Sequence, residues 1–200
     1  QNVWIAQREG RAKDGIDKTD PALLKMLAMG RRELSLGDSL SELHLVPVAI
    51  SYEFDACDIL KAEELHAIEK DGSFTKNEQT DIHSIVTGMI GFKGHVHVGF
   101  GSELGINSDE PELIAELIDE QILRNYRLSD VNYIAAEMLL EKGELLDPAL
   151  DAVIKEKIIS EEVRKIFFER ISKTQPALMK HLLFGYANPL INKLKSDLEL

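Results

Sequence analysis

Residues 2–27 read NVWIAQREGRAKDGIDKTDPALLKML. The run VWIA at residues 3–6 is short, apolar and rich in β-forming side chains, so it predicts a buried strand. A polar segment with several charges and two glycines follows, and a helix then begins with Thr19 or Asp20 as its cap and Pro21 at its first position. A strand, a polar loop and a helix in this order indicate α/β architecture, in which the loops that follow strands commonly hold ligands.

The same alternation continues to about residue 101. LHLVPVAISYEF predicts a long, largely buried strand around residues 46–50, where Pro47 implies a sheet edge or a bulge. Helices are expected at residues 59–70 and 77–90, and the glycine-bounded GFKGHVHVGFG at residues 91–101 predicts another strand. The fold class predicted for this part is α/β, with an incomplete mixed sheet and flanking helices.

The second half of the chain reads as helical and acidic. Caps, prolines at first helical positions and apolar faces recur in six segments, at residues 108–128, 129–143, 147–158, 160–171, 174–185 and 188–198. We therefore expect two regions, an α/β domain at residues 1–107 and an all-helical extension at residues 108–200. A helical and acidic region of this kind indicates a cover over the first region or an interaction surface more than a catalytic site.

The composition limits the function classes. The 200 residues carry a formal net charge of −12 at a sequence pI near 5.0, which argues against nucleic acid as a partner. The one cysteine, Cys57, excludes an internal disulfide and a cysteine-rich zinc site and favours a reducing compartment such as the cytoplasm. No apolar run reaches the 18 or so residues of a membrane span, so any membrane contact is expected to be peripheral.

The histidines offer two weak constellations. His66 and Asp71 have four residues between them, a spacing that could orient an imidazole base, but their lysine- and glutamate-rich helix favours a solvated surface. His95 and His97 would share one face of a strand, which suits a metal, yet no third ligand stands at a recognisable spacing. A metal hydrolase built on this pair is the least favoured alternative.

The segment REGRAK is the best candidate for a binding loop. Arg8 and Arg11 can grip a phosphate through paired hydrogen bonds, and Lys13 adds charge. Gly10 lets the backbone approach a ligand, and Glu9 can hold an arginine in position. A solvated turn with balanced charges is the alternative on composition alone.

The order of two motifs resembles the glycerolipid acyltransferases, the family that acylates glycerol 3-phosphate and lysophosphatidate. WIAQREGRAKDG is similar to the family's third block, where Glu9 and Gly10 match and Arg11 falls at the family's arginine if one residue is deleted. LHLVPVAISYEF is similar to the fourth block, with Pro47 at its centre. Three later segments, SYEFDACDILKAEEL, GMIGFKGHVHVGFG and NYRLSDVNYIAAEML, are similar to the extended bacterial form, so the resemblance covers about the first 140 residues. The loop departs from the family by lacking its usual threonine and serine.

The resemblance implies roles for the loop. Arg11 would be the main phosphate contact, assisted by Arg8 or Lys13, while Glu9 would position an arginine or a substrate hydroxyl. Pro47 would shape the wall of the acyl-donor site. The implied reaction transfers an acyl group from acyl-CoA or acyl carrier protein to a hydroxyl of glycerol phosphate or lysophosphatidate, and it needs no metal or redox cofactor.

The family's catalytic block, a His and an Asp with four residues between them, precedes the Glu-Gly loop. His66 and Asp71 come after the fourth block and are therefore not its counterpart, so no catalytic residue is expected within residues 1–200. We expect the chain to be the C-terminal part of a longer, cytoplasmic acyltransferase with peripheral contact to the inner face of the cell membrane. The alternative is a non-catalytic lipid- or protein-interaction module on the same scaffold.

Overall fold

A computed structural model of the chain describes residues 2–8, 10, 12–31, 33–75 and 77–198, with side chains to residue 196. Two compact units are present, and each is assembled from separate segments. The first unit comprises Gln1–Ala12, Asp17–Ser51 and His97–Arg127, and the second comprises Lys13–Ile16, Tyr52–Val96 and Leu128–Leu200. The boundary expected between residues 107 and 108 lies inside the first unit. The division of the chain into an acyltransferase domain and a helical extension stays a prediction.

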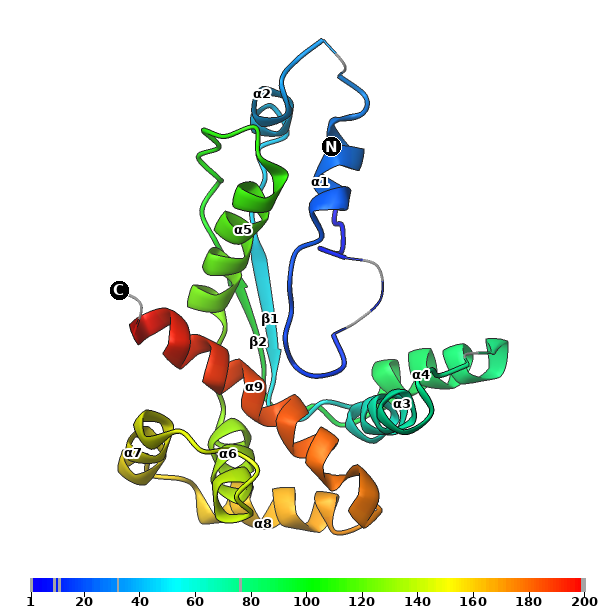
Figure 1. Cartoon of the computed structure of the whole chain (residues 1–200), viewed down its shortest axis with the longest axis vertical. Coiled ribbons are helices and arrows are strands. Elements are labelled where there is room, and N and C mark those ends of the chain that lie inside the picture. Colours follow the sequence, from blue (N-terminus) through cyan, green and yellow to red (C-terminus); the bar gives the residue numbers. More distant parts are fainter. Residues whose placement is uncertain (1, 9, 11, 32, 76, 199–200) are drawn as a thin grey trace. The chain divides into compact units, whose positions relative to one another are not determined.

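The first unit combines a two-stranded antiparallel ribbon with three helices in its described part (Figure 1). Its elements are α1 Pro21–Ala28, α2 Leu36–Ser41, β1 Val48–Tyr52, β2 Val96–Phe100 and α5 Pro111–Asn125, the outermost residues of the two strands being assigned to the second unit. Asp20 caps α1 by accepting a hydrogen bond from the Ala22 N–H. This confirms the predicted helix start, because Pro21 occupies the first helical position, where its missing N–H costs nothing.

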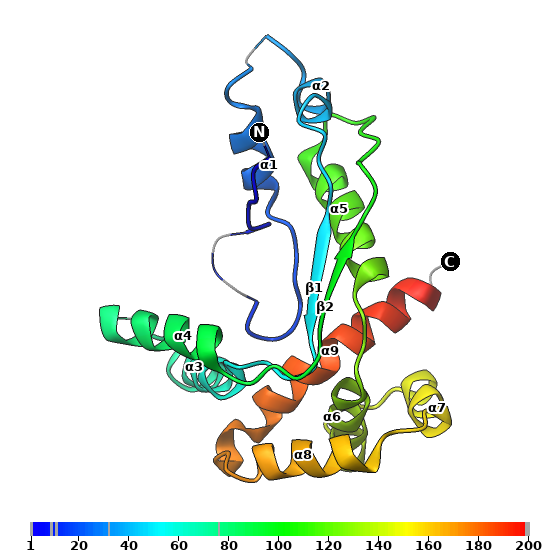
Figure 2. The ribbon, with the colours of Figure 1, turned by 180° about the vertical axis from the view of Figure 1, so that it is seen from behind.

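Helix α5 lies along the strands in both views (Figure 1, Figure 2). The Gln121 side chain accepts a hydrogen bond from the Ser102 N–H at 2.9 Å, and the Arg127 N–H donates to Ser51 Oγ at 3.2 Å. Side chains alternate along β1, so Ala49 and Ser51 are buried while Ile50 is exposed. The opposite, exposed face of the ribbon is apolar at Ile50, Val98 and Phe100.

The predicted strand at residues 3–6 is wrong. These residues are irregular, and Val3, Trp4 and Ile5 are exposed. An isolated strand cannot satisfy its backbone groups, and in the described part of the chain the sheet consists of β1 and β2 alone. The apolar, β-branched composition of residues 3–6 favours a strand, but no neighbouring strand is present in the described sheet to pair with it. Trp4 instead packs edge to face against the Phe100 ring.

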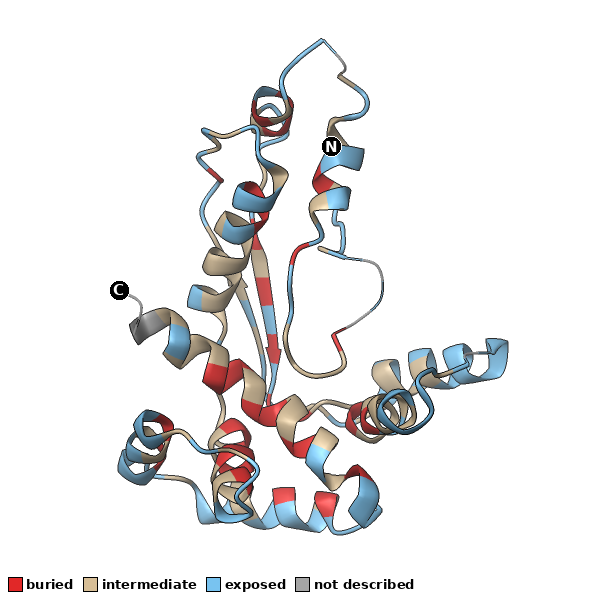
Figure 3. Ribbon diagram, viewed as in Figure 1, coloured by how far each residue is buried: buried red, intermediate tan, exposed pale blue. Residues whose placement is uncertain are grey.

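The second unit is helical. Its elements are α3 Asp58–Asp71, α4 Glu78–Ile90, α6 Asp130–Glu141, α7 Pro148–Glu156, α8 Glu161–Ile171, the 3-10 turn η1 Pro176–Leu178 and α9 Met179–Leu198. Figure 3 shows the buried residues gathered on the facing sides of α6, α8 and α9. Ile134, Phe167 and Leu183 are fully buried members of this core, which an amphipathic face on each helix provides.

Helix α9 corrects the expectation of two helices at residues 174–185 and 188–198. A single helix runs from Met179 to Leu198 with Pro189 inside it. Proline cannot donate to the carbonyl four residues earlier, so the Gly185 carbonyl loses its helical partner. The segment Lys13–Ile16 packs at this point, since Asn188 Nδ2 donates to the Asp14 carbonyl at 2.7 Å.

At the coarse level the predicted mixture of α and β structure is confirmed, with helices dominating. The six helices expected between residue 58 and residue 171 all begin within two residues of the predicted starts or caps. For α5 to α8, caps and prolines mark these starts in the sequence. Helix α2, whose six residues are capped by Ser35, was not expected from the sequence. An acyltransferase core stays a proposal.

Candidate functional site

The predicted binding loop belongs to the first unit up to Ala12. Arg8 and Gly10 are exposed, and Gly10 has a φ of 77°, a conformation that favours glycine. Glu9 and Arg11, which the sequence assigns to an arginine contact and to the phosphate, lie outside the described residues. Of residues 8–11 of the loop, the structure therefore describes Arg8 and Gly10.

Three hydrogen bonds fix the base of this loop. The Asp20 N–H donates to the Gln7 carbonyl at 2.8 Å and ties the loop's two ends together. Thr19 donates to Asp119 Oδ1 of α5 through its N–H at 2.8 Å and through its hydroxyl at 2.6 Å. Burial raises the pKa of Asp119, against the lowering effect of the hydrogen bonds from Thr19. The loop thus starts and ends on a fixed frame while Arg8 remains exposed.

Pro47 immediately precedes β1 in the first unit and is buried. Its carbonyl accepts a hydrogen bond from the Gly101 N–H at 2.8 Å, which extends the ladder beyond the end of β1. The expected sheet edge agrees with this position, because β1 pairs with β2 alone in the described sheet and proline has no N–H to give on its free side. Among the described residues, no hydrogen bond or ion pair joins Pro47 to Arg8 or Gly10.

Lys13 lies in the second unit. Its Nζ is 2.9 Å from Glu64 Oε1 on α3, and both side chains are partly buried. The charge of Lys13 is therefore already compensated, and a phosphate would have to compete with Glu64 for it. The assistance that Lys13 gives to phosphate binding stays a prediction.

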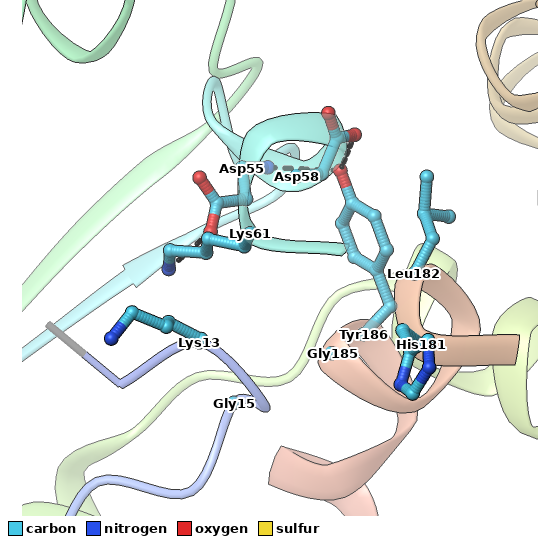
Figure 4. A pocket seen from close by; sticks show the side chains of 9 residues that line it. All are labelled: Lys13, Gly15, Asp55, Asp58, Lys61, His181, Leu182, Gly185 and Tyr186. Carbon is cyan, nitrogen blue, oxygen red and sulfur yellow. Dashed lines mark hydrogen bonds and ion pairs between the residues drawn. The ribbon is translucent and has the colours of Figure 1, made fainter. Parts of the chain in front are cut away.

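A small hollow in the second unit is lined by Lys13, Gly15, Asp55, Asp58, Lys61, His181, Leu182, Gly185 and Tyr186 (Figure 4). Both signs of charge line it, but they are paired. Lys61 Nζ lies 2.6 Å from Asp55 Oδ2, and the Tyr186 hydroxyl donates to Asp58 Oδ2 at 2.7 Å. The hollow offers about 30 Å³ to a water-sized molecule, far less than a substrate pocket.

The polar side chains at the floor of the hollow form a satisfied network. Arg170 Nε lies 2.6 Å from Asp58 Oδ2, and Arg170 Nη2 donates to the Asp55 carbonyl at 2.7 Å. The Tyr186 hydroxyl also accepts a hydrogen bond from the Asp55 N–H at 3.0 Å. Each group thus has a partner, as buried polar groups require.

The pKa shifts in this network follow from burial and charge. Burial, followed by the charge of Asp58, raises the pKa of Tyr186 well above its usual value. Burial disfavours the charge on Arg170, but the hydrogen bond and charge of Asp58 outweigh it and raise the pKa of Arg170. Tyr186 therefore stays a neutral phenol and Arg170 a cation, and the network joins α3, α8 and α9.

The histidines are arranged differently from the sequence expectations. Asp71 is exposed, while His66 is half-buried beside His181, their ring centroids 5.8 Å apart. His95 Nδ1 lies 2.8 Å from Glu53 Oε2, and its side chain is 97% exposed. In the part of the chain that the structure describes, the group of three potential ligands close enough to share a cation is His66, Glu69 and His181.

This group escaped the sequence reasoning because it joins helices α3 and α9, more than 100 residues apart in the chain. A His and a Glu three residues apart on one helix were its only local signal.

Comparison of the chain with protein-family models, with curated proteins and with solved structures gave no match. Among the described helices, none combines the length and apolar character needed to cross a membrane.

Proposed function

We propose that the chain is part of a glycerolipid acyltransferase. The observation that carries the proposal is the order of two motifs, the REGRAKDG loop and, after α1 and α2, the LVPVAISY segment that contains Pro47 and β1. Loop and strand belong to the same compact unit up to Ala12 and Ser51.

The frame of the loop supports this proposal. A phosphate cradle needs exposed donors on a backbone that does not rearrange when the ligand arrives. The bond between Asp20 and Gln7 closes the loop, and the contacts of Thr19 with Asp119 anchor it on α5. Arg8 is exposed on this frame, and the positive φ of Gly10 is a conformation in which backbone N–H groups can turn toward an anion.

The proposed reaction is acyl transfer to an alcohol. A hydroxyl oxygen of glycerol phosphate or lysophosphatidate attacks the thioester carbonyl, a new C–O bond forms, and the C–S bond breaks to release the thiol. The hydroxyl proton passes to a histidine of the family's first block, outside residues 1–200, and then to the departing thiolate. In this reaction residues 1–200 bind the phosphate, chiefly through Arg11. Pro47 forms part of the wall of the acyl-donor site.

The partners follow from the same proposal. The donor is acyl-CoA or acyl carrier protein, and the acceptor is a phosphorylated glycerol or its monoacyl ester. The protein works in the cytoplasm with peripheral contact to a membrane, since an acylated acceptor resides there. The reaction as written calls for no metal or redox cofactor.

The test is the kinetics of Arg11→Ala in the protein expressed from its complete reading frame. Loss of one charge-assisted contact to the phosphate should cost about 1–3 kcal/mol of transition-state stabilisation. This corresponds to a fall of about 5- to 150-fold in kcat/KM for the phosphorylated acceptor. The apparent KM for the acyl donor should not change. Arg124→Ala, on an exposed face of α5, is the matched control. Unchanged acceptor kinetics in Arg11→Ala would remove the assignment of the loop.

One observation favours the second candidate, a non-catalytic interaction module. Helix α4 exposes a stripe of apolar side chains at helical spacing, namely Ile82, Ile85, Val86, Met89 and Ile90. The partly buried side of the helix carries Ser84, Thr87 and Gly88, and the Ser84 carbonyl accepts a hydrogen bond from Cys57 Sγ at 3.5 Å. An exposed apolar stripe of this kind marks an interaction surface.

Sedimentation with phosphatidylcholine vesicles distinguishes the two candidates when it is combined with the acyl-transfer assay. An interaction module should bind vesicles through α4 and release no thiol with any acceptor. Ile85→Glu should abolish that binding, while Glu78→Gln on the same helix should not.

A further inference from the structure

Three side chains that can ligate a metal converge between two helices of the second unit. His66 and Glu69 lie three residues apart on α3, and His181 is the third residue of α9. One ligand atom from each side chain lies within 4.8 Å of the others. His181 Nε2 is already 2.9 Å from Glu69 Oε2.

The chemistry of these donors is that of zinc. Two imidazole nitrogens and one carboxylate oxygen form a common three-ligand set for Zn²⁺, with water in the fourth position. Tetrahedral binding at about 2.0–2.1 Å places the donor atoms about 3.4 Å apart. The distances of up to 4.8 Å therefore close by side-chain rotation, without movement of either helix.

The two helices that supply the ligands are held in place independently of any ion. The Tyr186 hydroxyl on α9 donates to Asp58 Oδ2 on α3 at 2.7 Å, at a buried position. Leu182, next to His181, is buried in the core of the second unit. A site on a fixed frame binds more tightly, since less order has to be imposed when the ion arrives.

The lysines near the cluster are held by carboxylates. In the hollow that His181 lines, Lys13 is paired with Glu64 and Lys61 with Asp55. Lys180 is adjacent to His181 in the chain, but its Nζ is held 2.7 Å from Glu144 Oε2. Glu69 has an exposed side chain, and His181 lines the solvent-connected hollow of Figure 4. An ion and its water ligand can therefore reach the cluster from solvent.

We propose that His66, Glu69 and His181 bind one divalent zinc-class cation, which fastens α3 to α9. The ion takes the place of the direct contact between His181 Nε2 and Glu69 Oε2. This site does not depend on the proposed acyl transfer, because none of its residues is assigned to the substrate loop.

The experiment is a titration of the chelator-treated 200-residue chain with Zn²⁺ alone, followed by calorimetry and by NMR of the histidine ring nitrogens. We expect one ion per chain with a Kd on the order of 1–10 µM. The ring nitrogens of His66 and His181 should shift on binding, and those of His83 should not. The midpoint of thermal unfolding should rise by about 5–11 °C at an ion concentration 100 times Kd.

Variants assign the ligands. His181→Ala and His66→Ala should each weaken binding at least about tenfold, and Glu69→Gln should weaken it less. His83→Ala, on α4, is the matched control and should bind as the unchanged chain does. Should the His66 or His181 variants fail to fold, the NMR shifts of the unchanged chain decide alone. No binding below 100 µM, or shifts confined to His95 and His97, would overturn the proposal.

Discussion

Two glycines with the same backbone conformation have very different surroundings. Gly10 has a φ of 77° with nothing within 4 Å of a β-carbon built on it. Gly15 has a φ of 75°, and a β-carbon there would lie 2.3 Å from the Gly185 carbonyl oxygen and 3.1 Å from Pro189 Cδ. The turn at Gly15 therefore occupies the place on α9 where Pro189 interrupts the helical hydrogen bonds.

Replacing Gly15 with alanine is expected to destabilise the second unit. The left-handed backbone costs about 1–2 kcal/mol for any other residue, and the collision with Gly185 adds to it, for a total of about 2–4 kcal/mol. Gly10→Ala carries the backbone cost alone, about 1–2 kcal/mol, and is the control. Urea unfolding of the two variants checks this difference, and equal losses in both would contradict the packing of Gly15 on α9.

Asp119 predicts a dependence of stability on pH. Its pKa is raised in the folded protein, chiefly by burial. A raised pKa means that folding favours the protonated carboxyl, so its contribution is fully present below pH 3.8, the ordinary value, and is lost as the pH rises through the folded pKa. Asp119→Asn keeps an oxygen that can accept from Thr19 and never ionises.

The unfolding free energy of Asp119→Asn, minus that of the unchanged chain, should therefore be more positive at pH 6 than at pH 3.5. Urea unfolding at both pH values measures this. Asp109→Asn is a useful contrast, because hydrogen bonds from the Gly37 N–H and from Ser35 lower the pKa of Asp109. That variant should lose relative stability over the same rise in pH. A constant difference for Asp119→Asn would contradict its burial.

At the scale of elements, α3, α8 and α9 meet through one buried network. Asp58 has a side chain that is 5% exposed and receives Arg170 of α8 and Tyr186 of α9. Because a carboxylate with no counter-charge is costly in such a place, the three helices depend on each other through it.

Arg170→Met is expected to lower the free energy of unfolding by about 2–4 kcal/mol. This is somewhat less than the loss from breaking a fully buried ion pair, because Arg170 is partly exposed. Lys155→Met on α7 breaks an exposed pair with Asp151 and should cost less than about 0.5 kcal/mol. Denaturant unfolding of both variants gives the comparison. A loss in Arg170→Met no larger than that in Lys155→Met would show that the network does not hold the helices together.

Sequence signals were reliable where the cause is local. Asp20 with Pro21 and Ser160 with its acidic first turn mark helix starts, since caps act on the next three residues. The signals failed where the cause is tertiary. The run at residues 3–6 has strand composition but no partner strand in the described sheet, and Pro189 sits inside a helix that packing sustains.

The candidate sites also differ in whether their cause is local in the sequence or tertiary. The binding loop at Arg8 to Lys13 was predicted from residue types and motif order, which are properties of a contiguous segment. The network around Asp58 and the cluster of His66, Glu69 and His181 unite α3 with the last helices, and a spacing of more than 100 residues carries no pattern. The ion pair between Lys13 and Glu64 was equally unforeseen, because Glu64 is one of many acids on α3.

For the molecule as a whole, the chain passes between the two units five times, after residues 12, 16, 51, 96 and 127. Neither unit is therefore a contiguous segment. The second unit draws Phe54 and Ala62 of its core, and Asp58 of its network, from the first half of the chain.

We expect residues 128–200 alone to unfold without a cooperative transition, because Tyr186 and Arg170 lose Asp58 and the core loses α3. Thermal unfolding followed by circular dichroism measures this. Adding residues 1–127 should restore a cooperative transition in the mixture. A transition in residues 128–200 alone with the same midpoint as the full chain would contradict the assembly of the second unit.

The acyltransferase proposal is tested most directly by thiol release from acyl-CoA with lysophosphatidate as acceptor. The protein is expressed from its complete reading frame, the background from Cys57 is subtracted, and Arg11→Ala and Arg124→Ala are run in parallel. We predict release that requires the acceptor and that falls about 5- to 150-fold in Arg11→Ala but not in Arg124→Ala. No release from the folded protein with lysophosphatidate or glycerol phosphate, and with acyl carrier protein also tried as donor, would contradict the proposal and favour the interaction module.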